Sequence, residues 1–184
     1  MTNAEEFEAF MRSYQDMVYT TAVRLLGNDA DAADAAQEVF LKAYERFGEL
    51  RGNPRAGGWL KVTTRNHCLN HLTRYRARYK LFTDVAGQDD DQTPDLADRV
   101  AAPETHDADV DTADRRTLLE AALHRLPDAQ RVPLVLYHFE ELSYEEIAGR
   151  LEVSLSKVKT DIHRARIALR KKITRGRAQP TELP

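Results

Sequence analysis

Residues 144–166 read YEEIAGRLEVSLSKVKTDIHRAR, and this stretch decides the fold of the C-terminal part of the chain. Two short helical patterns are joined here by a break of only a few residues. Ser143 and Glu146 form a capping box ahead of the first pattern, and Ser154 can cap the second. Ala148 is small enough for the two helices to cross closely. This layout is that of a helix-turn-helix, whose second helix enters the major groove of DNA.

The second helix of the pair has one apolar face and one basic face. Its apolar stripe follows helical spacing and consists of Val158, Ile162, Ala165 and Leu169. The outward residues can neutralise phosphates, and one or two of them can read guanine edges. They are Ser156, Lys157, Lys159, Thr160, His163, Arg164 and Arg166. A helical hairpin with a merely solvated basic face is the alternative, but the tight turn and the two caps favour DNA binding.

One position in this stretch resists the helix-turn-helix interpretation. Glu152 occupies the place in the turn where glycine is frequent. A glutamate held there in the left-handed conformation costs about 1 kcal/mol.

Composition places the chain among soluble globular proteins. It has 184 residues, of which 42% are hydrophobic and 31% charged. No apolar run is long enough to span a membrane, and the acidic start MTNAEEFEAF does not resemble a signal peptide. The lone cysteine, Cys68, excludes an internal disulfide framework. We therefore expect a cytoplasmic protein with no membrane contact of its own.

The charge is distributed in three blocks, although the net charge is only −3. Residues 1–80 hold twelve Lys/Arg against ten Asp/Glu, residues 81–114 hold one against eleven, and residues 115–184 hold fourteen against nine. The middle block has few large apolar residues and cannot offset the entropy of ordering it. This predicts an all-α protein of two small helical domains, 1–80 and 115–184, joined by an acidic flexible linker at 81–114.

Apolar spacing predicts where the helices of both domains lie. In the first domain we expect helices over residues 5–26, about 30–47 and about 59–78. Gly27 ends the first of these, and Asp29 or Asp31 caps the next. In the second domain the helical pattern resumes near Arg115, and another helix starts at Asp128. Pro133 is tolerated if it lies in the first turn or so of that helix.

Three segments together resemble a known family. Residues 126–169, LPDAQRVPLVLYHFEELSYEEIAGRLEVSLSKVKTDIHRARIAL, resemble region 4 of the extracytoplasmic-function (ECF) sigma factors, which are initiation subunits of bacterial RNA polymerase. Residues 29–47, DADAADAAQEVFLKAYERF, are similar to region 2.2 of that family. Residues 59–76, WLKVTTRNHCLNHLTRYR, are similar to regions 2.3 and 2.4. Two matching blocks in the right order, on either side of an acidic connector, are far more specific than either alone.

The resemblance implies a role for each matching residue set. The residues that lie where the family docks on core RNA polymerase are Asp31, Asp34, Gln37, Glu38 and Leu41, whereas Phe40 shares the other side of the helix and is expected in the core. The candidates for opening and reading the −10 element are Lys61, Arg65, Asn66, Asn70, Arg74 and Arg76. The −35 contacts of the family map onto Lys159, Thr160, His163 and Arg164. The implied partners are core RNA polymerase, promoter DNA and an anti-sigma factor.

One departure from the family pattern concerns the −35 helix. Asp161 stands where the family often has a large or basic residue. Since a carboxylate near phosphates is repulsive, Asp161 must point away, pair with Arg164 or Lys157, or accept from a cytosine amino group.

No motif in the chain indicates catalysis. There is no Gly-rich phosphate loop, no nucleophile–base pair and no spaced Cys/His set; His67, Cys68 and His71 come closest to a metal site. We expect no catalytic residue, no cofactor and no metal. The function predicted is transcription initiation by a sigma factor. The alternatives are a DNA-binding regulator that uses only its helix-turn-helix, and an interaction module whose DNA face is vestigial.

Overall fold

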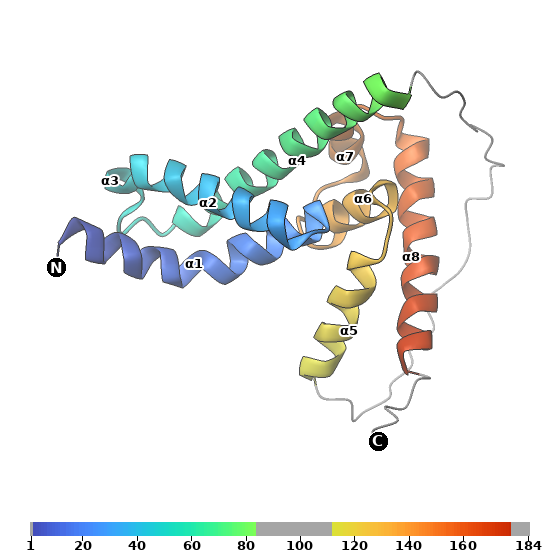
Figure 1. The fold of residues 1–184 in the computed structure, drawn as a ribbon, viewed down its shortest axis with the longest axis horizontal. Helices are drawn as coiled ribbons and strands as arrows, with labels where there is room; N and C mark the ends of the chain where they lie inside the picture. The colour runs from blue at the N-terminus through green and yellow to red at the C-terminus, as the bar shows by residue number, and fades with distance from the viewer. Residues whose placement is uncertain (1, 84–111, 178–184) are drawn as a thin grey trace.

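The computed structural model describes residues 2–83 and 112–177, and at 74–83, 112–114 and 175–177 it describes the backbone alone. Every regular element in these residues is an α-helix, as the apolar spacing predicts. Figure 1 shows two groups of helices, α1 to α4 and α5 to α8, which lie against each other. The predicted acidic linker falls mostly outside the described residues. Among the described helices, none has the length and apolar content needed to cross a membrane.

The first group consists of α1 (Asn3–Leu26), α2 (Asp29–Glu45), α3 (Phe47–Leu50) and α4 (Ala56–Thr83). Gly27 ends α1 in the left-handed conformation, with φ 74°, as predicted. The prediction that Asp29 or Asp31 caps α2 is wrong, because Asn28 is the cap. Its side chain accepts a hydrogen bond from the backbone N–H of Asp31 at 2.7 Å. The two aspartates lie in the first turn instead, where their charge favours the helix N-terminus.

The core of this group forms where α1, α2 and α4 meet. Val18, Val39, Ala43 and Leu60 are fully buried there, and Phe40 is 9% exposed, which confirms that it is a core residue. Aromatic side chains pack around this centre, and they are Phe7, Phe10, Tyr14 and Trp59.

The second group consists of α5 (Thr112–His124), α6 (Asp128–His138), α7 (Tyr144–Leu151) and α8 (Leu155–Arg177). The start of α6 at Asp128 agrees with the prediction. Pro133 lies deeper in α6 than the first turn, and it is buried there. Because proline has no N–H, the helix lacks one backbone hydrogen bond at this point. Helix α4 continues to Thr83 and α5 begins at Thr112, so both extend into the predicted linker range.

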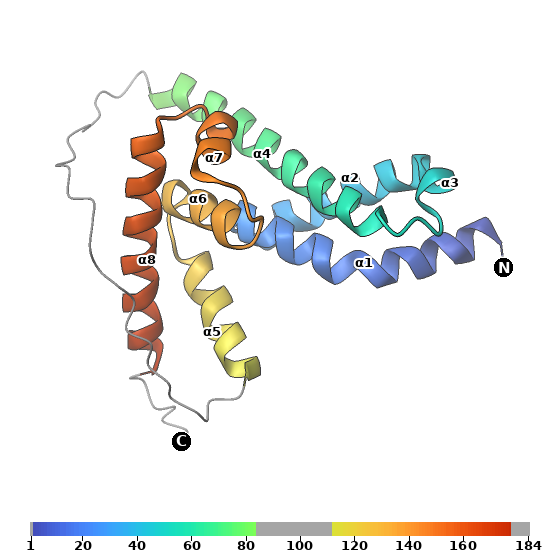
Figure 2. The same cartoon turned by 180° about the vertical axis from the view of Figure 1, so that it is seen from behind.

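The two groups share one hydrophobic core. Leu25 of α1 and Leu72 of α4 belong to the same buried cluster as Leu123 of α5 and Leu136 of α6. Figure 2 shows α6 against the C-terminal end of α1, with α7 next to α4. The two groups are therefore packed together in this structure, although the sequence predicts separate domains on a tether.

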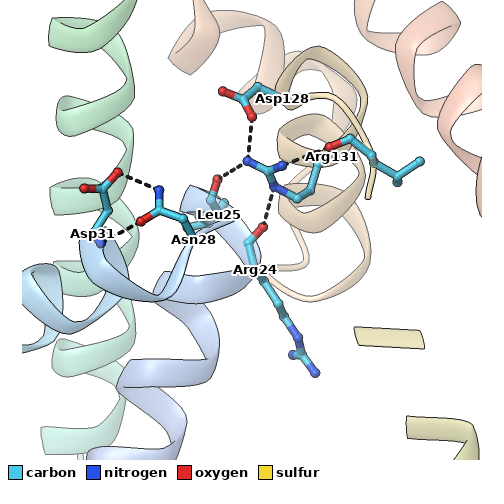
Figure 3. A network of polar contacts seen from close by, with 7 residues as sticks. Arg24, Leu25, Asn28, Asp31, Asp128 and Arg131 are labelled. Atoms are coloured by element: carbon cyan, nitrogen blue, oxygen red, sulfur yellow. Dashed lines mark hydrogen bonds and ion pairs between the residues drawn. The ribbon is translucent and has the colours of Figure 1, made fainter. Parts of the chain in front are cut away.

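A buried arginine joins the groups at the end of α1 (Figure 3). Arg131 of α6 donates from Nε to the carbonyl oxygen of Arg24 at 3.1 Å, and from Nη2 to that of Leu25 at 3.4 Å. It also donates to the carbonyl of Leu126 at 3.0 Å and to the carboxylate of Asp128 at 2.7 Å. The last carbonyls of a helix have no partner within the helix. The guanidinium of Arg131 supplies partners for two of those of α1.

Candidate DNA and polymerase interfaces

The helix-turn-helix is formed by α7, a short turn and α8. At its start Ser143 accepts from the backbone N–H of Glu146 at 3.2 Å, and the carboxylate of Glu146 accepts from that of Ser143 at 2.8 Å. Ser154 caps α8 by accepting from the N–H of Lys157 at 3.2 Å. Glu152 ends α7 with φ 55° and ψ 44°, in the left-handed conformation. The capping box, the second cap and the strained turn residue are all confirmed.

Helix α8 buries the predicted stripe and exposes most of the predicted DNA-facing residues. Val158, Ile162 and Ala165 are at most 1% exposed, and Leu169 is half-buried. The outward residues that are exposed are Ser156, Lys157, Lys159, His163, Arg164 and Arg166, and Thr160 is half-buried. A row of cations on one exposed helix face can follow the phosphates of a groove.

Arg166 differs from the other outward residues because it packs back onto α6. Its Nε donates to Nε2 of His138 at 3.4 Å, and its guanidinium lies 5.5 Å from the ring centre of Tyr137. Burial, and secondly the nearby charge of Arg166, lower the pKa of His138. His138 is thereby favoured in the neutral form, which can accept from Arg166.

Asp161 combines two of the three arrangements that the sequence leaves open. It is buried, and its carboxylate lies 3.2 Å from Nζ of Lys157. With Asp128, Pro133 and Val158 it lines a small pocket where α6, α7 and α8 meet. Asp161 therefore pairs with Lys157 and points toward the domain, which removes the repulsion from phosphates.

The acidic side of α2 is a continuous exposed stripe. Asp34, Gln37, Glu38 and Leu41 are exposed, and Leu41 retains 59% of its surface. Asp31 is half-buried, and its carboxylate accepts from the side-chain amide of Asn28 at 2.7 Å. The structure thus gathers four of the five predicted polymerase contacts on one open face, with Asp31 at its N-terminal edge.

An apolar groove of about 700 Å³ runs beside this stripe, between α1 and α2. Gln37 and Leu41 belong to its lining, which also includes Met11, Tyr19 and Tyr44. Tyr19 is 38% exposed and Tyr44 52%. The sequence analysis did not identify Met11, Tyr19 and Tyr44 as part of a binding surface. Tyr19 could have indicated one, because it is an aromatic residue outside the apolar stripe of its helix and therefore faces away from the core.

Three of the predicted −10 residues on α4, Lys61, Arg65 and Asn66, contact the second group of helices. Nζ of Lys61 donates to the carbonyl oxygen of Phe139 at 3.0 Å. Arg65 is buried, with its guanidinium 3.9 Å from the carboxylate of Glu140. Asn66 is exposed and accepts from the guanidinium of Arg150 at 3.2 Å. Asn70 is exposed, whereas the side chains of Arg74 and Arg76 lie outside the described ones.

Burial dominates the electrostatics of this contact. It raises the pKa of Glu140, and the charges of Lys61, Arg65 and Arg24 oppose that rise. Burial also lowers the pKa of Arg65; the charge of Arg150 adds to this effect, and that of Glu140 opposes it. An arginine stays protonated after such a shift. Arg65 is therefore a cation that lies beside the buried carboxyl group of Glu140, in a site with little access to water.

Metal-ligating side chains do not gather in the described part of the chain, where no group of three or more His, Cys, Asp or Glu is close enough to hold an ion. Cys68 is fully buried, and its burial raises the pKa of the thiol to about 12. The thiol is therefore unreactive at neutral pH.

Family models match both halves of the chain. The model described as Sigma-70 region 2 matches residues 10–78, and the model described as Sigma-70, region 4 matches residues 116–169. The ECF RNA polymerase sigma factor SigW of Bacillus subtilis (strain 168) is 34% identical over 171 residues, which are 92% of this chain and 89% of SigW. The chain belongs to the ECF sigma factors. It is therefore a transcription initiation factor that directs RNA polymerase to promoters.

A second relative agrees with this membership. The RNA polymerase sigma-H factor of Pseudomonas aeruginosa PAO1 is 32% identical over 171 residues, covering 90% of this sigma factor and 84% of the relative.

Among solved structures, one likeness in overall chain path is to RpoE in its complex with the anti-sigma factor NepR from Bartonella quintana, and the match covers 92% of this chain and 98% of RpoE. The TM-score of that match is 0.47 at 20% identity.

Proposed function

We propose that this sigma factor divides its work between the two groups of helices. The α1–α2 face binds core RNA polymerase, α4 opens and reads the −10 element, and α8 reads the −35 element. The domain ranges are then 1–80 for region 2, 81–114 for the linker and 115–184 for region 4. The observation that carries the proposal is that the chain exposes two oppositely charged surfaces, an acidic stripe on α2 and a row of cations on α8.

The stripe and the groove suit a protein partner. Asp34 and Glu38 present negative charge, and Leu41 and Tyr44 present apolar surface beside it. A helix or helix pair with basic and apolar residues would bury both. The residues proposed to bind polymerase are Asp31, Asp34, Gln37, Glu38 and Leu41, joined by Tyr19 and Tyr44 from the groove.

The cationic faces suit nucleic acid. We propose that Lys159, His163 and Arg164 of α8 contact the −35 duplex. Ser156, Lys157, Thr160 and Arg166 lie around them and complete the proposed DNA-binding surface. We propose that Lys61, Arg65, Asn66, Asn70, Arg74 and Arg76 of α4 hold the −10 strand, where cations follow the backbone and amides can hydrogen-bond a flipped base. In this proposal the chain contributes binding energy and catalyses no reaction, so it is not an enzyme. It acts together with the polymerase in the cytoplasm. An anti-sigma partner stays a prediction from family membership.

The test is run-off transcription with purified bacterial core polymerase and a DNA fragment from upstream of the gene for this chain. A discrete transcript that requires this protein is the expected result, and it locates the start site. Asp34→Lys should abolish both the transcript and polymerase binding while the helical content stays unchanged. Glu8→Lys is the matched control, since Glu8 is an exposed acidic residue on α1 that forms an exposed ion pair with its neighbour Arg12. A wild-type protein that does not bind polymerase would contradict the proposal.

A further inference from the structure

Arg166 belongs to the proposed −35 surface of α8, yet its side chain is held by α6. Nε of Arg166 lies 3.4 Å from Nε2 of His138, and Nη2 of Arg166 lies 3.3 Å from the same ring nitrogen. Both distances are long for a hydrogen bond between protein groups. The contact therefore holds the guanidinium weakly enough to be reversed.

Two tyrosine rings form the other wall of this contact. The guanidinium of Arg166 lies 5.5 Å from the ring centre of Tyr137, within reach of a cation–π interaction. The ring of Tyr137 stacks on that of Tyr144 of α7, with ring centres 4.8 Å apart, and meets the ring of His138 edge to face at 4.9 Å. Tyr137 and Tyr144 also pack against the hydrophobic core. The place that receives Arg166 is thus built from rings that the fold holds in position.

The position of Arg166 along α8 continues the row of cations. Lys159, His163 and Arg166 follow one another at spacings of four and three residues, so they share one side of the helix. All three are exposed. A guanidinium released from α6 extends this row by one charge, which can pair with a further phosphate.

The protonation state of the His138 ring decides whether it can hold Arg166. A neutral imidazole has one nitrogen that accepts a hydrogen bond, whereas an arginine has donors alone. Nε2 of His138 can therefore accept from Arg166 when the ring proton is on Nδ1. Once the ring binds a second proton, both nitrogens are donors, and the imidazolium and the guanidinium repel each other. One proton thus turns an attractive contact into a repulsive one.

The surroundings of His138 direct the effect of this proton to Arg166. Burial, and secondly the charge of Arg166, lower the pKa of His138. Other ionisable groups lie on the elements around this end of α6, which are the connection to α7, α7 itself, α8 and α1. They are Glu140, Glu141, Tyr144, His163 and Arg24. Of these, Glu140 and Arg24 are engaged in ion pairs with other helices.

We propose that His138 is a positioning residue of −35 recognition that acts through Arg166: its neutral ring holds the guanidinium on α6, and its protonated ring releases it to a phosphate of the −35 duplex. The inference rests on the proposed role of α8. It makes promoter binding by this sigma factor tighter in mild acid than near neutral pH.

DNA binding should raise the pKa of His138, and this fixes the sign of the pH dependence. In the free chain the charge of Arg166 favours the neutral ring. In the complex Arg166 has moved away, and the nearby phosphates favour the protonated ring. A group that binds its proton more tightly in the complex strengthens binding as the pH falls.

The first measurement follows the ring of His138 in the full chain without DNA. NMR titration between about pH 5 and about pH 8 reports proton uptake by each imidazole, and His138→Gln identifies the signal of this one. Arg166→Gln removes the neighbouring cation, so the pKa of His138 should be higher in that variant than in wild type. An unchanged titration would overturn the inference and leave the proposed function standing.

The second measurement is promoter binding by the holoenzyme that the full chain forms with core polymerase. The probe is a fluorescein-labelled duplex carrying the promoter located by run-off transcription. Glutamine can accept from Arg166 and does not titrate, so His138→Gln should hold the guanidinium at every pH. The ratio of wild-type to His138→Gln affinity cancels the pH dependence of the polymerase and of His163, which both proteins contain.

This ratio should depend on pH. We expect equal affinities at about pH 8 and an affinity about fivefold higher for wild type at about pH 5.5, the effect of one exposed charge pair. At the lower pH the slope of log affinity against log salt should be steeper for wild type by about 1, because one more phosphate is neutralised. Equal affinities at both pH values would overturn the inference.

Arg166→Gln completes a double-mutant cycle that separates positioning from a direct effect of the imidazolium charge. Without Arg166 there is no guanidinium to release, so adding His138→Gln should change the affinity by no more than about twofold at either pH. A pH-dependent ratio that persists in this background would show that His138 acts on DNA by its own charge, against the inference.

His124→Gln is the matched control for the loss of a histidine. His124 is exposed in the last turn of α5 and belongs to neither proposed interface. This variant should bind the promoter as wild type does at both pH values, and a pH dependence like that of His138→Gln would overturn the inference. Circular dichroism at both pH values checks the helical content of every variant.

A further variant separates the inference from the proposed function. Lys159→Ala removes a cation of the same row that does not depend on His138. If Lys159→Ala weakens promoter binding while wild type and His138→Gln bind equally, the inference fails and the proposed role of α8 stands. If Lys159→Ala and Arg166→Gln both bind as wild type does at both pH values, α8 does not contact the duplex, and both fail.

Discussion

At the scale of single residues, Arg131 and Gly27 show how the two domains are fitted together. The guanidinium of Arg131 has four acceptors, two of them carbonyls at the end of α1. It lies against the open side of Gly27, where an added Cβ would come within 2.3 Å of it. Gly27 is therefore required twice, for its positive φ and for the space that Arg131 occupies.

Gly27→Ala should destabilise the protein by roughly 2 kcal/mol or more. Alanine is strained at φ 74°, which costs about 1–2 kcal/mol, and its methyl group would displace the buried guanidinium of Arg131. Gly149→Ala is the control, because Gly149 lies within α7 with nothing inside 4 Å of an added Cβ; this change should stabilise the helix by about 0.5–1 kcal/mol. Equilibrium urea denaturation measures both. A Gly27→Ala protein as stable as wild type would show that Arg131 does not occupy this place in solution.

At the scale of elements, the helix-turn-helix is held by local contacts that the sequence displays. Ser143, Glu146 and Ser154 satisfy backbone groups at the starts of α7 and α8. The left-handed Glu152 lets the chain reverse between them. The arrangement of α8 is therefore determined by a few residues on either side of the turn, together with the buried stripe.

The capping box of α7 should make stability depend on pH. Hydrogen bonds from Ser143 lower the pKa of Glu146 in the folded protein. A carboxylate with a lowered folded pKa stabilises the fold above its unfolded pKa, and this contribution is lost as the pH falls through the folded pKa. Glu146→Gln keeps a hydrogen-bonding side chain without the charge. The stability of wild type relative to Glu146→Gln should therefore be greatest near neutral pH and fall in acid, measured by thermal unfolding between about pH 3 and pH 7. A difference that is independent of pH would contradict the assignment.

Asp161 should be a structural residue of α8 and not a base-reading one. Its carboxylate is buried and paired with Lys157. Asp161→Ala should leave the base preference at the −35 element unchanged, and affinity should change by no more than about threefold. Lys159→Ala should weaken binding to all sequences and reduce the slope of log affinity against log salt by about 1. Binding to a panel of single-base −35 variants at several salt concentrations measures both. A changed base preference in Asp161→Ala would show that the carboxylate reads DNA.

At the scale of the whole molecule, the packing of the helices decides which of the proposed binding faces is exposed. The α1–α2 groove and the acidic stripe stay open while region 4 lies on α4. The proposed polymerase face is therefore accessible in this structure, whereas Lys61 is half-buried and Arg65 is buried against the second group of helices.

Leu41→Ala should weaken polymerase binding without affecting the fold. Leu41 is 59% exposed, so its truncation leaves no internal cavity, and it lines the groove proposed to receive the partner. Loss of one apolar anchor at an interface costs about 1–2 kcal/mol, which lowers the affinity by roughly tenfold. Val62→Ala is the control, because Val62 is an apolar α4 residue with 44% exposure outside the groove. Fluorescence titration with core polymerase measures both, and equal affinities of the two variants would place the interface elsewhere.

The sequence by itself determined the helices, the caps at Gly27, Ser143 and Ser154, and the family. Gly27, Ser143 and Ser154 interact with backbone groups only a few residues away, so their role can be predicted from the neighbouring sequence. The apolar stripe of α8 repeats with the period of the helix, so it too can be predicted from the sequence. The sequence did not show that Asn28, and not Asp29 or Asp31, caps α2, because asparagine and aspartate both cap helices and the three positions lie within one turn of each other. Only the tertiary structure decided that Arg65 meets Glu140, that Arg131 closes the end of α1, and that Tyr19 joins Leu41 in a groove. These contacts join residues far apart in the chain, and no periodic pattern along a sequence records which distant surfaces bury each other.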